Sequence, residues 1–364
     1  MRVILIVNRG MGAGCLNIHG GVWAETPFLD ALAAESLVAR HHFAETPSPS
    51  EISGIWLQGL KAWGKNAPFR MRVVDPKLPR PFPALISGAQ ELSPALAAKA
   101  LSKAIAKSGR DELLIVERGD LLLPWSEEIL EVADPGPALG EADPEEPTGP
   151  IGAQLGLVDP MGAQARRLQA ARAEILTKFD SDLELIYNEV DNAWRGTPWA
   201  LVVTSDTGFP LGEMGHVGPD PERPLSQEVL RIPLVIHTPL IEPGSACRDF
   251  TDHRSFADWL IRARDFRGAG IPDLVGKSRH LARHLAPSEK GEIRWDSLRD
   301  CNSTLIRRAN TLQEDDNCLF WFRQPEDWHE VNDLANREPD ACQVAAATLD
   351  GLLSQGASEG PGHP

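Results

Sequence analysis

Two short polar segments, each directly after an apolar run, carry side chains that are suited to chemistry. Asn8 and Arg9 follow the β-branched run at residues 3–7, and Asp206 follows the run at residues 199–204. Runs of this kind are typical of buried strands in a parallel sheet, and α/β folds place their sites in the loops at the carboxyl ends of such strands. The Asp206 carboxylate is a ligand type that hard cations prefer, whereas the Arg9 guanidinium offers only donors and a fixed positive charge.

Serine and histidine residues between positions 41 and 50 are further candidates for a site. Ser48 and Ser50 are nucleophiles only if a base activates them, and no base is identifiable nearby, so we expect turn hydrogen bonds from them. His41 and His42 have the residue type of a metal pair, but adjacent residues on a helix point in different directions. We therefore expect solvent-exposed or capping roles for these two histidines.

The glycine-rich first loop and the tryptophans are two features that we do not expect to bind ligands. Gly10, Gly12 and Gly14 occupy alternate positions, a spacing that matches neither the dinucleotide-binding fingerprint nor the P-loop, and no Gly-Lys-Ser/Thr follows. The ten tryptophans, Trp328 among them, are expected to anchor the core or a subdomain interface.

The elements that must position these residues follow from apolar periodicity and helix boundary signals. Thr26 is placed to cap a helix in which Pro27 suits the first turn. The pattern predicts buried strands at residues 3–7, 112–116, 199–204 and 234–237, and helices at residues 26–35, 94–108, 164–194 and 255–264. Buried strands between helices indicate an α/β fold.

The composition and the residue patterns divide the chain into three parts. Residues 1–287 form the predicted α/β core, which contains an acidic, proline-rich excursion at residues 127–150 and a surface loop at residues 68–83. Residues 288–353 carry short strand-like segments and then a helix, which predicts an antiparallel C-terminal subdomain. Residues 354–364 are rich in glycine, serine and proline, and we expect a disordered tail.

Composition excludes some partners. The 364 residues carry a formal net charge of −16, which argues against nucleic acid and against anionic membranes, because both require a basic surface. The five cysteines are scattered without a Cys-x-x-Cys pair, and no secretory signal or membrane span is visible. We therefore expect a cytoplasmic protein.

Four later segments, in order, resemble motifs of the sulfatase family in the alkaline phosphatase superfamily. They are Thr-Pro-x-Leu-Asp-x-Leu-Ala at residues 26–33, Thr-Ser-Asp-Thr-Gly with Leu-Gly-Glu-Met-Gly at residues 204–215, Glu-x-Leu-Arg-Ile-Pro-Leu-Val-Ile at residues 228–236, and the segment 325–334. With the first strand they extend the resemblance from residue 2 to about residue 350. The resemblance implies an alkaline-phosphatase-like, mostly parallel sheet sandwiched between helices, with a smaller C-terminal antiparallel α+β subdomain.

The resemblance also implies where the family's catalytic groups would lie. Sulfatases bind a divalent metal through two adjacent Asp residues after the first strand and an Asp-His or Asp-Asn pair in the later motif. Here the two acids are replaced by Asn8 and Arg9, and Thr207 follows the retained Asp206. One carboxylate of about three does not hold a hard cation against water, so we expect no metal and no other cofactor.

The family's nucleophile is a formylglycine made from the Cys of Cys-x-Pro-Ser-Arg. The best match here is the segment 47–51, in which Pro47 takes the Cys position and Glu51 takes the Arg position. We therefore expect no catalytic residue. Our hypothesis is that the Arg9 guanidinium fills the volume of the metal and pairs with Glu51, Asp206 or both. The alternative is that Arg9 and Glu51 are both solvated loop residues.

These replacements predict a sulfatase-like pseudoenzyme that acts as a binding or scaffold protein for a protein or small molecule. The alternative is an active sulfatase or phosphoesterase with a rebuilt site around Asp206. In that case Asn8 and Asp206 would hold calcium or another divalent metal, and Ser48 and His216 would be the catalytic fallback residues. A third possibility is a protein interaction module that uses the acidic segment 134–150.

Overall fold

A computed structural model describes residues 1–61, 63, 69–74, 85–109, 112–123, 125, 155–266, 272–288, 291–310 and 313–358. The predicted excursion at residues 127–150, with the segment 134–150 inside it, lies outside these residues. So do residues 359–364 of the predicted tail and residues 75–83 of the predicted surface loop.

The core of the fold is an eight-stranded sheet with the order β10-β2-β9-β7-β1-β5-β3-β4. Its central strand β1 runs parallel to β5 and β7, and β9 runs antiparallel to both of its neighbours. This confirms the predicted mostly parallel sheet. In chain order the strands are β1 (Arg2–Asn8), β2 (Ser36–Phe43), β3 (Phe69–Val73), β4 (Gln90–Leu92), β5 (Leu113–Arg118), β7 (Trp199–Thr204), β9 (Leu234–His237) and β10 (Ala246–Asp252).

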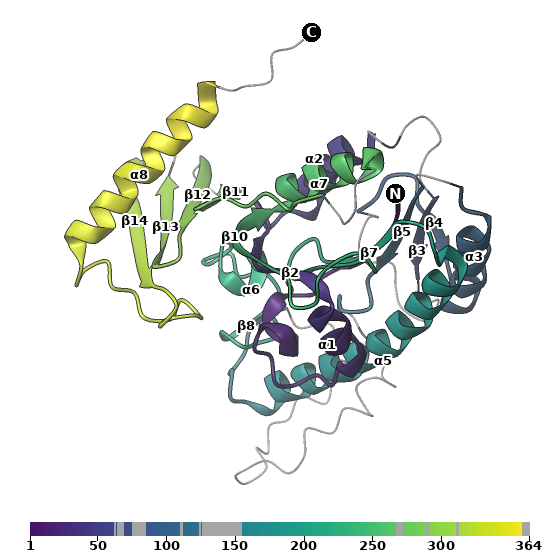
Figure 1. Ribbon diagram of the computed structural model, residues 1–364. Coiled ribbons are helices and arrows are strands. Elements are labelled where there is room, and N and C mark those ends of the chain that lie inside the picture. The colour runs from purple at the N-terminus through teal and green to yellow at the C-terminus, as the bar shows by residue number, and fades with distance from the viewer. Residues whose placement is uncertain are drawn as a thin grey trace.

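Helices cover both faces of this sheet (Figure 1). One face packs against α1 (Pro27–Ala34), α3 (Pro94–Lys107) and α5 (Ala163–Trp194) through Ile4 and Ile6 of β1. The other face packs against α2 (Pro49–Lys61) and α7 (His253–Asp265) through Val3, Leu5 and Val7 of the same strand. A strand that is buried on both faces is apolar at every position, which is why β1 and β7 were recognisable in the sequence.

The start of α1 lies where the sequence placed it, but its cap differs from the prediction. The Thr26 side chain makes no capping hydrogen bond, and its buried hydroxyl oxygen has no partner. Instead, Asp180 of α5 accepts hydrogen bonds from the backbone N–H groups of Phe28 and Leu29, at 2.9 and 2.7 Å. The first turn of α1 is therefore stabilised by a carboxylate of α5, which is 152 residues from Phe28 and 151 residues from Leu29 in the sequence.

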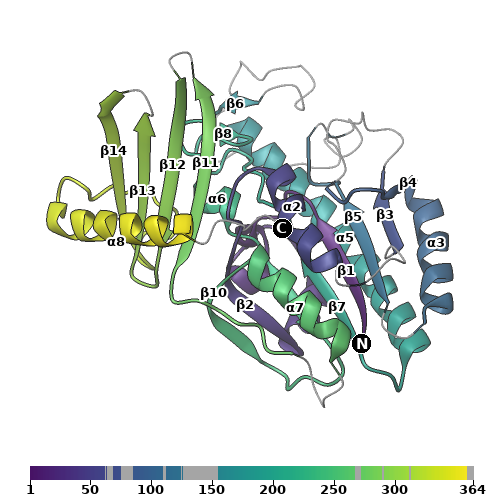
Figure 2. The ribbon, with the colours of Figure 1, turned by 90° about the horizontal axis from the view of Figure 1, so that it is seen from above.

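A second sheet, with the order β11-β12-β13-β14, is antiparallel and forms the smaller C-terminal subdomain beside the main sheet (Figure 2). Helix α8 (Pro339–Ser358) packs on it through Cys342 and Leu349. The first strand begins at His280, before the predicted boundary, and α8 includes residues 354–358, which were predicted to be disordered. The strands are β11 (His280–Ser288), β12 (Gly291–Arg299), β13 (Ser303–Asn310) and β14 (Gln313–Arg323).

Four strands of the main sheet, β2, β3, β4 and β10, were not predicted. The segment 69–73, which was predicted to be loop, forms β3, and β2 carries His41 and His42 on successive, opposite sides of a strand. The remaining described elements are short: η1 (Ala13–Cys15), η2 (Asn17–His19), β6 (Gly156–Leu157), β8 (His216–Val217) and α6 (Gln227–Leu230). Within the described residues, no helix is long and apolar enough to cross a membrane.

Candidate functional site

The carboxyl ends of three parallel strands bring the predicted site residues together. In the register of the sheet, Val7 of β1 is opposite Glu117 of β5 on one side and Thr204 of β7 on the other. The chain after each strand therefore leaves the sheet at the same edge, and this is why Arg9 and Asp206, which are 197 residues apart, come into contact.

Arg9 is buried in this edge and is paired with two carboxylates. Its Nε donates a hydrogen bond of 3.0 Å to Asp206 Oδ2, and its Nη1 lies 3.4 Å from Glu117 Oε1. All three side chains are at least 97% buried. The predicted ion pair with Asp206 is present, and Arg9 is not a solvated loop residue.

The other acid of this group, Glu117, was missed in the sequence because it lies at the end of an apolar strand and belongs to no motif. It is fully buried, and its two oxygens accept hydrogen bonds from the backbone N–H groups of Leu85 and Ile86, at 2.7 and 3.3 Å. Burial raises the pKa of Glu117, and the hydrogen bond from Leu85 and the charge of Arg9 oppose that shift. We call Arg9, Glu117 and Asp206 the arginine centre.

Asp206 has no oxygen free of protein donors. Its Oδ1 accepts from the backbone N–H groups of Gly10 and Thr207, at 3.1 and 2.8 Å, and from the Ser205 hydroxyl at 3.3 Å. Its Oδ2 accepts from Arg9. A cation at Asp206 would have to displace these donors as well as the guanidinium, so the carboxylate is held as a hydrogen-bond acceptor.

His253 supports the backbone of this loop from the α7 side. Trp56 Nε1 donates to His253 Nδ1 at 2.8 Å, and His253 Nε2 lies 2.8 Å from the carbonyl oxygen of Asp206. Because an indole only donates and a carbonyl only accepts, the proton of the neutral ring is on Nε2. Burial lowers the pKa of His253 to about 4, so the ring is neutral at pH 7.

The arginine centre does not fit a metal ion. Within the described residues, no group of three or more His, Cys, Asp or Glu side chains is arranged to hold a metal. Asn8 donates from Nδ2 to the sulfur of Met11 at 3.8 Å, while its buried Oδ1 has no hydrogen-bond partner. That single neutral oxygen beside a guanidinium is a poor ligand set for a hard divalent cation.

The other sequence candidates are not brought to the arginine centre. Glu51 lies in the first turn of α2 with an exposed side chain, and within the described residues it makes no ion pair. Of the two partners proposed for Arg9, Asp206 is therefore the one observed, and Glu117 is a second partner that was not proposed. Pro47 is half-buried just before α2. The Ser48 hydroxyl lies 3.0 Å from that of Ser50.

The two histidine predictions have different outcomes. His216 belongs to β8, and its Nδ1 lies 3.1 Å from the carbonyl oxygen of Gly218, so it is engaged with its own loop. His42, which was expected to be exposed or capping, is fully buried, and its Nδ1 lies 2.9 Å from the Thr251 hydroxyl. His41 is half-buried. The period of two in β2, read as helix in the sequence, explains the error for His42.

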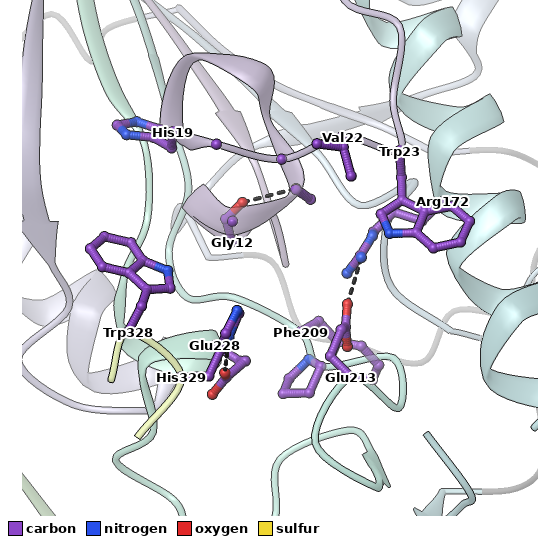
Figure 3. A pocket seen from close by; sticks show the side chains of 15 residues that line it. Gly12, His19, Val22, Trp23, Arg172, Phe209, Glu213, Glu228, Trp328 and His329 are labelled. Carbon is purple, nitrogen blue, oxygen red and sulfur yellow. Dashed lines mark hydrogen bonds and ion pairs between the residues drawn. The ribbon is translucent and has the colours of Figure 1, made fainter. Parts of the chain in front are cut away.

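A cavity of about 490 Å³ is lined in part by residues that follow the arginine centre in the chain, Gly12 after Arg9 and Phe209 after Asp206 (Figure 3). Two ion pairs lie in its wall: Arg172 Nη2 is 2.5 Å from Glu213 Oε1, and His329 Nδ1 is 3.3 Å from Glu228 Oε1. Trp328 also lines the cavity, so its side chain is available to a ligand as well as to a subdomain interface. The described lining residues are Gly12, Gly14, Cys15, His19, Gly20, Gly21, Val22, Trp23, Arg172, Phe209, Pro210, Glu213, Glu228, Trp328 and His329.

Sequence reasoning missed this cavity because its walls come from separate parts of the chain. They are the loop after β1, helix α5, the loop after β7, helix α6 and the turn after β14. Two signals were available: the glycine spacing at Gly12 and Gly14, and the motif segments 204–215, 228–236 and 325–334, which contribute Glu213, Glu228, Trp328 and His329 to the lining.

Comparison with known proteins identifies the fold. No family model matches the sequence, and no curated protein matches it. Solved structures similar to this chain include a 2-O GAG sulfatase (TM-score 0.66, 11% identity, 97% of this chain and 92% of that chain). They also include the phosphonate monoester hydrolase of Agrobacterium radiobacter (TM-score 0.64, 14% identity, 98% and 95%). A third is a protein solved with its substrate D-glucosamine-2-N,6-O-disulfate (TM-score 0.69, 13% identity, 99% and 98%).

These similarities extend over nearly the whole chain, although the identities are low. They agree with the two-sheet architecture and with the order of the motifs at residues 26–33, 204–215 and 228–236. The chain therefore has the fold of sulfatases and phosphonate monoester hydrolases.

Proposed function

We propose that this chain is a sulfatase-like binding or scaffold protein that hydrolyses no ester and holds no catalytic metal. The observation that carries the proposal is the buried ion pair between Arg9 and Asp206, with Glu117 as the second carboxylate. Ester hydrolysis on this fold, as the resemblance implies it, needs a divalent cation to stabilise the charge that develops on the ester oxygens. Here the Arg9 guanidinium neutralises the buried carboxylates of Asp206 and Glu117 instead, so these charges stabilise the folded protein rather than a reacting ester.

The nucleophile side of the site supports the same proposal. Pro47 has no reactive atom, and Ser48 lies beside another hydroxyl, Ser50, rather than beside a base. His216 bonds its own loop. A hydrolase built from Ser48, His216 and Asp206 would require these residues to rearrange, and it is the outcome against which the proposal is tested.

The experiment combines metal analysis with an activity assay. We expect the purified protein to contain no stoichiometric divalent metal, and its melting temperature to be unchanged by calcium, magnesium, manganese or EDTA. We also expect no turnover of an aryl sulfate, an aryl phosphate or an aryl phosphonate. Stoichiometric metal together with turnover that is lost in Asp206→Ala would overturn the proposal.

A charge-reversal variant tests whether the guanidinium acts in place of a cation. Arg9→Asp places three carboxylates in one buried group, which should destabilise the protein and make its melting temperature rise with calcium. Arg9→Met is the matched control, because it removes the guanidinium without adding a ligand. We expect calcium to stabilise Arg9→Asp more than Arg9→Met, and an equal response of both variants would contradict the assignment.

Two further parts of the proposal concern location and partners. A cytoplasmic location is supported by the five cysteines, all of which are free thiols. A protein partner for the acidic segment 134–150 stays a prediction, tested by partner capture with and without a deletion of that segment.

A further inference from the structure

The cavity shown in Figure 3 has the size and the composition of a small-molecule site. Its volume of about 490 Å³ lies within the range of roughly 300–1,000 Å³ that is usual for ligand pockets. Its described lining residues do not include Arg9, Glu117 or Asp206, so it is distinct from the place where the resemblance puts ester chemistry. Gly12, Gly14, Gly20 and Gly21 form part of the wall. A Cβ at Gly14 or Gly20 would meet no atom within 4 Å, whereas one at Gly21 would meet backbone atoms at 2.7 Å.

The charges that line the cavity cancel in pairs. Arg172 is 9% exposed and pairs with Glu213, and His329 pairs with Glu228 (Figure 3). Burial would raise the pKa of Glu213, but the charge of Arg172 outweighs it and lowers that pKa. The hydrogen bond with Glu228 raises the pKa of His329. Among the described lining residues, a sulfate, phosphate or carboxylate ligand would meet two carboxylates and no cation that lacks an acid partner, and a cationic ligand would find both acids already paired.

The cavity nevertheless offers unused hydrogen-bonding groups. Glu228 Oε2 is buried and has no partner, so it can accept a hydrogen bond from a ligand hydroxyl. The Arg172 guanidinium, one nitrogen of which contacts Glu213, has further N–H donors. The site therefore favours an uncharged ligand that both donates and accepts hydrogen bonds.

Aromatic and apolar side chains form the rest of the wall. Trp23 is 52% exposed and Val22 is 86% exposed at the cavity, and Trp328 lies on the opposite side of the view in Figure 3. The far face of Trp328 is occupied, because the Arg231 guanidinium lies 3.7 Å from its ring centroid. That contact fixes the indole as a rigid wall. Large aromatic faces beside paired charges suit a ligand that has one apolar face and several hydroxyl groups.

We propose that this cavity binds a neutral carbohydrate, with the apolar face of a sugar ring against Trp23 or Trp328 and its hydroxyls bonded to Glu228 and Arg172. The inference rests on the binding role proposed above and names the ligand class for it. A nucleoside would also stack on an indole, but it has a flat base with few hydroxyls. The hydrogen-bonding groups at Glu228 and Arg172, whose charges are already paired, favour the sugar because it carries more hydroxyl groups.

The experiment measures binding of defined sugars to the full chain by saturation-transfer NMR and tryptophan fluorescence. The probes are glucose, galactose, N-acetylglucosamine, lactose and cellobiose, with glucose 6-sulfate and adenosine as comparisons. Gly14→Leu adds a bulky side chain at a residue that lines the cavity, where a Cβ meets no atom within 4 Å. Gly351→Leu on α8 is the matched control, since its Cβ also meets nothing within 4 Å.

We expect at least one neutral sugar to bind, with affinity reduced about tenfold or more in Gly14→Leu and in Trp23→Ala, and unchanged in Gly351→Leu. Absence of binding by every neutral sugar overturns the inference. Binding that Gly14→Leu leaves unchanged overturns the site, and tighter binding of adenosine or glucose 6-sulfate overturns the ligand class. Because these readouts involve neither metal nor ester turnover, failure here is distinguishable from failure of the proposed function.

Discussion

At the scale of the residue, the Arg9 guanidinium determines how the buried acids of the arginine centre are neutralised. A buried carboxylate needs a positive partner or hydrogen bonds, and Asp206 has both, through Arg9 and through three donors on Oδ1. A metal would give the same compensation and also act as a Lewis acid toward a bound ester. The guanidinium provides compensation alone, because its donors point at fixed protein acceptors.

Removing that guanidinium should destabilise the protein strongly. We expect Arg9→Met to lower the free energy of unfolding by about 3–5 kcal/mol, because it leaves Asp206 and Glu117 buried without their cation. The double variant Arg9→Met/Asp206→Asn should cost less than the sum of its parts. Urea denaturation measures both, with Arg195→Met as control, since its pair with Asp191 is 71% exposed on the arginine side and worth about 0.3–0.5 kcal/mol. Additive costs would show that Arg9 and Asp206 are not coupled.

At the scale of the element, the cap of α1 shows how tertiary contacts replace local signals. The sequence contains Thr26 at the expected capping position, yet its hydroxyl is buried without a partner. Asp180 from α5 holds the two N–H groups instead, which ties the start of α1 to the long helix that packs beside it.

Because Asp180 rather than Thr26 caps α1, we expect substitutions at these two residues to change the free energy of unfolding in different directions. Asp180→Ala should cost about 1–3 kcal/mol, because it leaves two backbone N–H groups of α1 unsatisfied. Thr26→Val should be neutral or stabilising, since it removes a buried hydroxyl that has no partner. Denaturant midpoints of the two variants check this, and a larger loss in Thr26→Val would restore the capping role predicted from sequence.

At the scale of the whole molecule, a buried ion pair inside the C-terminal subdomain contacts the α/β body through the hydrogen bonds of both its members. Arg299 of β12 contacts Glu330 at 3.1 Å and donates to the carbonyl oxygen of Leu225. Glu330 in turn accepts from the backbone N–H of Gln227 at 3.2 Å, and its own carbonyl accepts from Arg223 at 2.7 Å. Both charged side chains are almost fully buried, so the contact between the two parts is a fixed one.

Loss of the Arg299–Glu330 pair should destabilise the contact between the C-terminal subdomain and the α/β body. We expect Glu330→Ala to cost about 3–5 kcal/mol, because Arg299 stays buried without its acid. Hydrogen exchange should become faster in β12 and in α6 than in β1 or β7. Arg323→Met, which removes a pair with Glu338 that is 61% exposed on the arginine side, is the control and should change little.

Buried histidines between the main sheet and the C-terminal sheet make stability depend on pH. Burial lowers the pKa of His253 to about 4 and that of His280 to about 3. Below the ordinary value of 6.5 the unfolded chain binds these protons first, so stability falls as the pH falls from about 6.5 to about 4. Burial raises the pKa of Glu45 to about 7, which acts in the opposite sense: its contribution is present below pH 4.5 and is lost as the pH rises toward 7.

Replacing one of these histidines should flatten the acid side of the stability profile. In His280→Leu, the slope of unfolding free energy against pH between pH 6.5 and 4 should decrease by up to about 1.4 kcal/mol per pH unit. His329→Gln should change the profile in the opposite sense, because the hydrogen bond with Glu228 raises the pKa of His329. Urea denaturation at several pH values measures both slopes, and an unchanged slope in His280→Leu would show that His280 does not titrate on unfolding.

The sequence alone predicted the strands that are buried on both faces and the helices that have a regular apolar stripe. Strands β1, β7 and β9 are apolar on both faces, so composition identified them, and helices α3, α5 and α7 carry a regular apolar stripe. The positions of Asn8 and Arg9 were also readable, because both follow a recognisable strand. That they replace metal ligands stays a prediction from the resemblance. Strand β2 was not predicted because its sequence lacks a regular alternation: three apolar residues at 37–39 are followed by three polar ones at 40–42.

Only the tertiary structure decided which groups meet. Glu117, rather than Glu51, is the second partner of Arg9 because the register of β5 against β1 places Glu117 beside the end of β1, while Glu51 lies on an exposed helix turn. The cavity is assembled from five separate parts of the chain, so no local pattern encodes it. Sequence fixes residue type and local periodicity, whereas strand register and helix packing determine distances between residues far apart in the chain, and those distances control charge pairing.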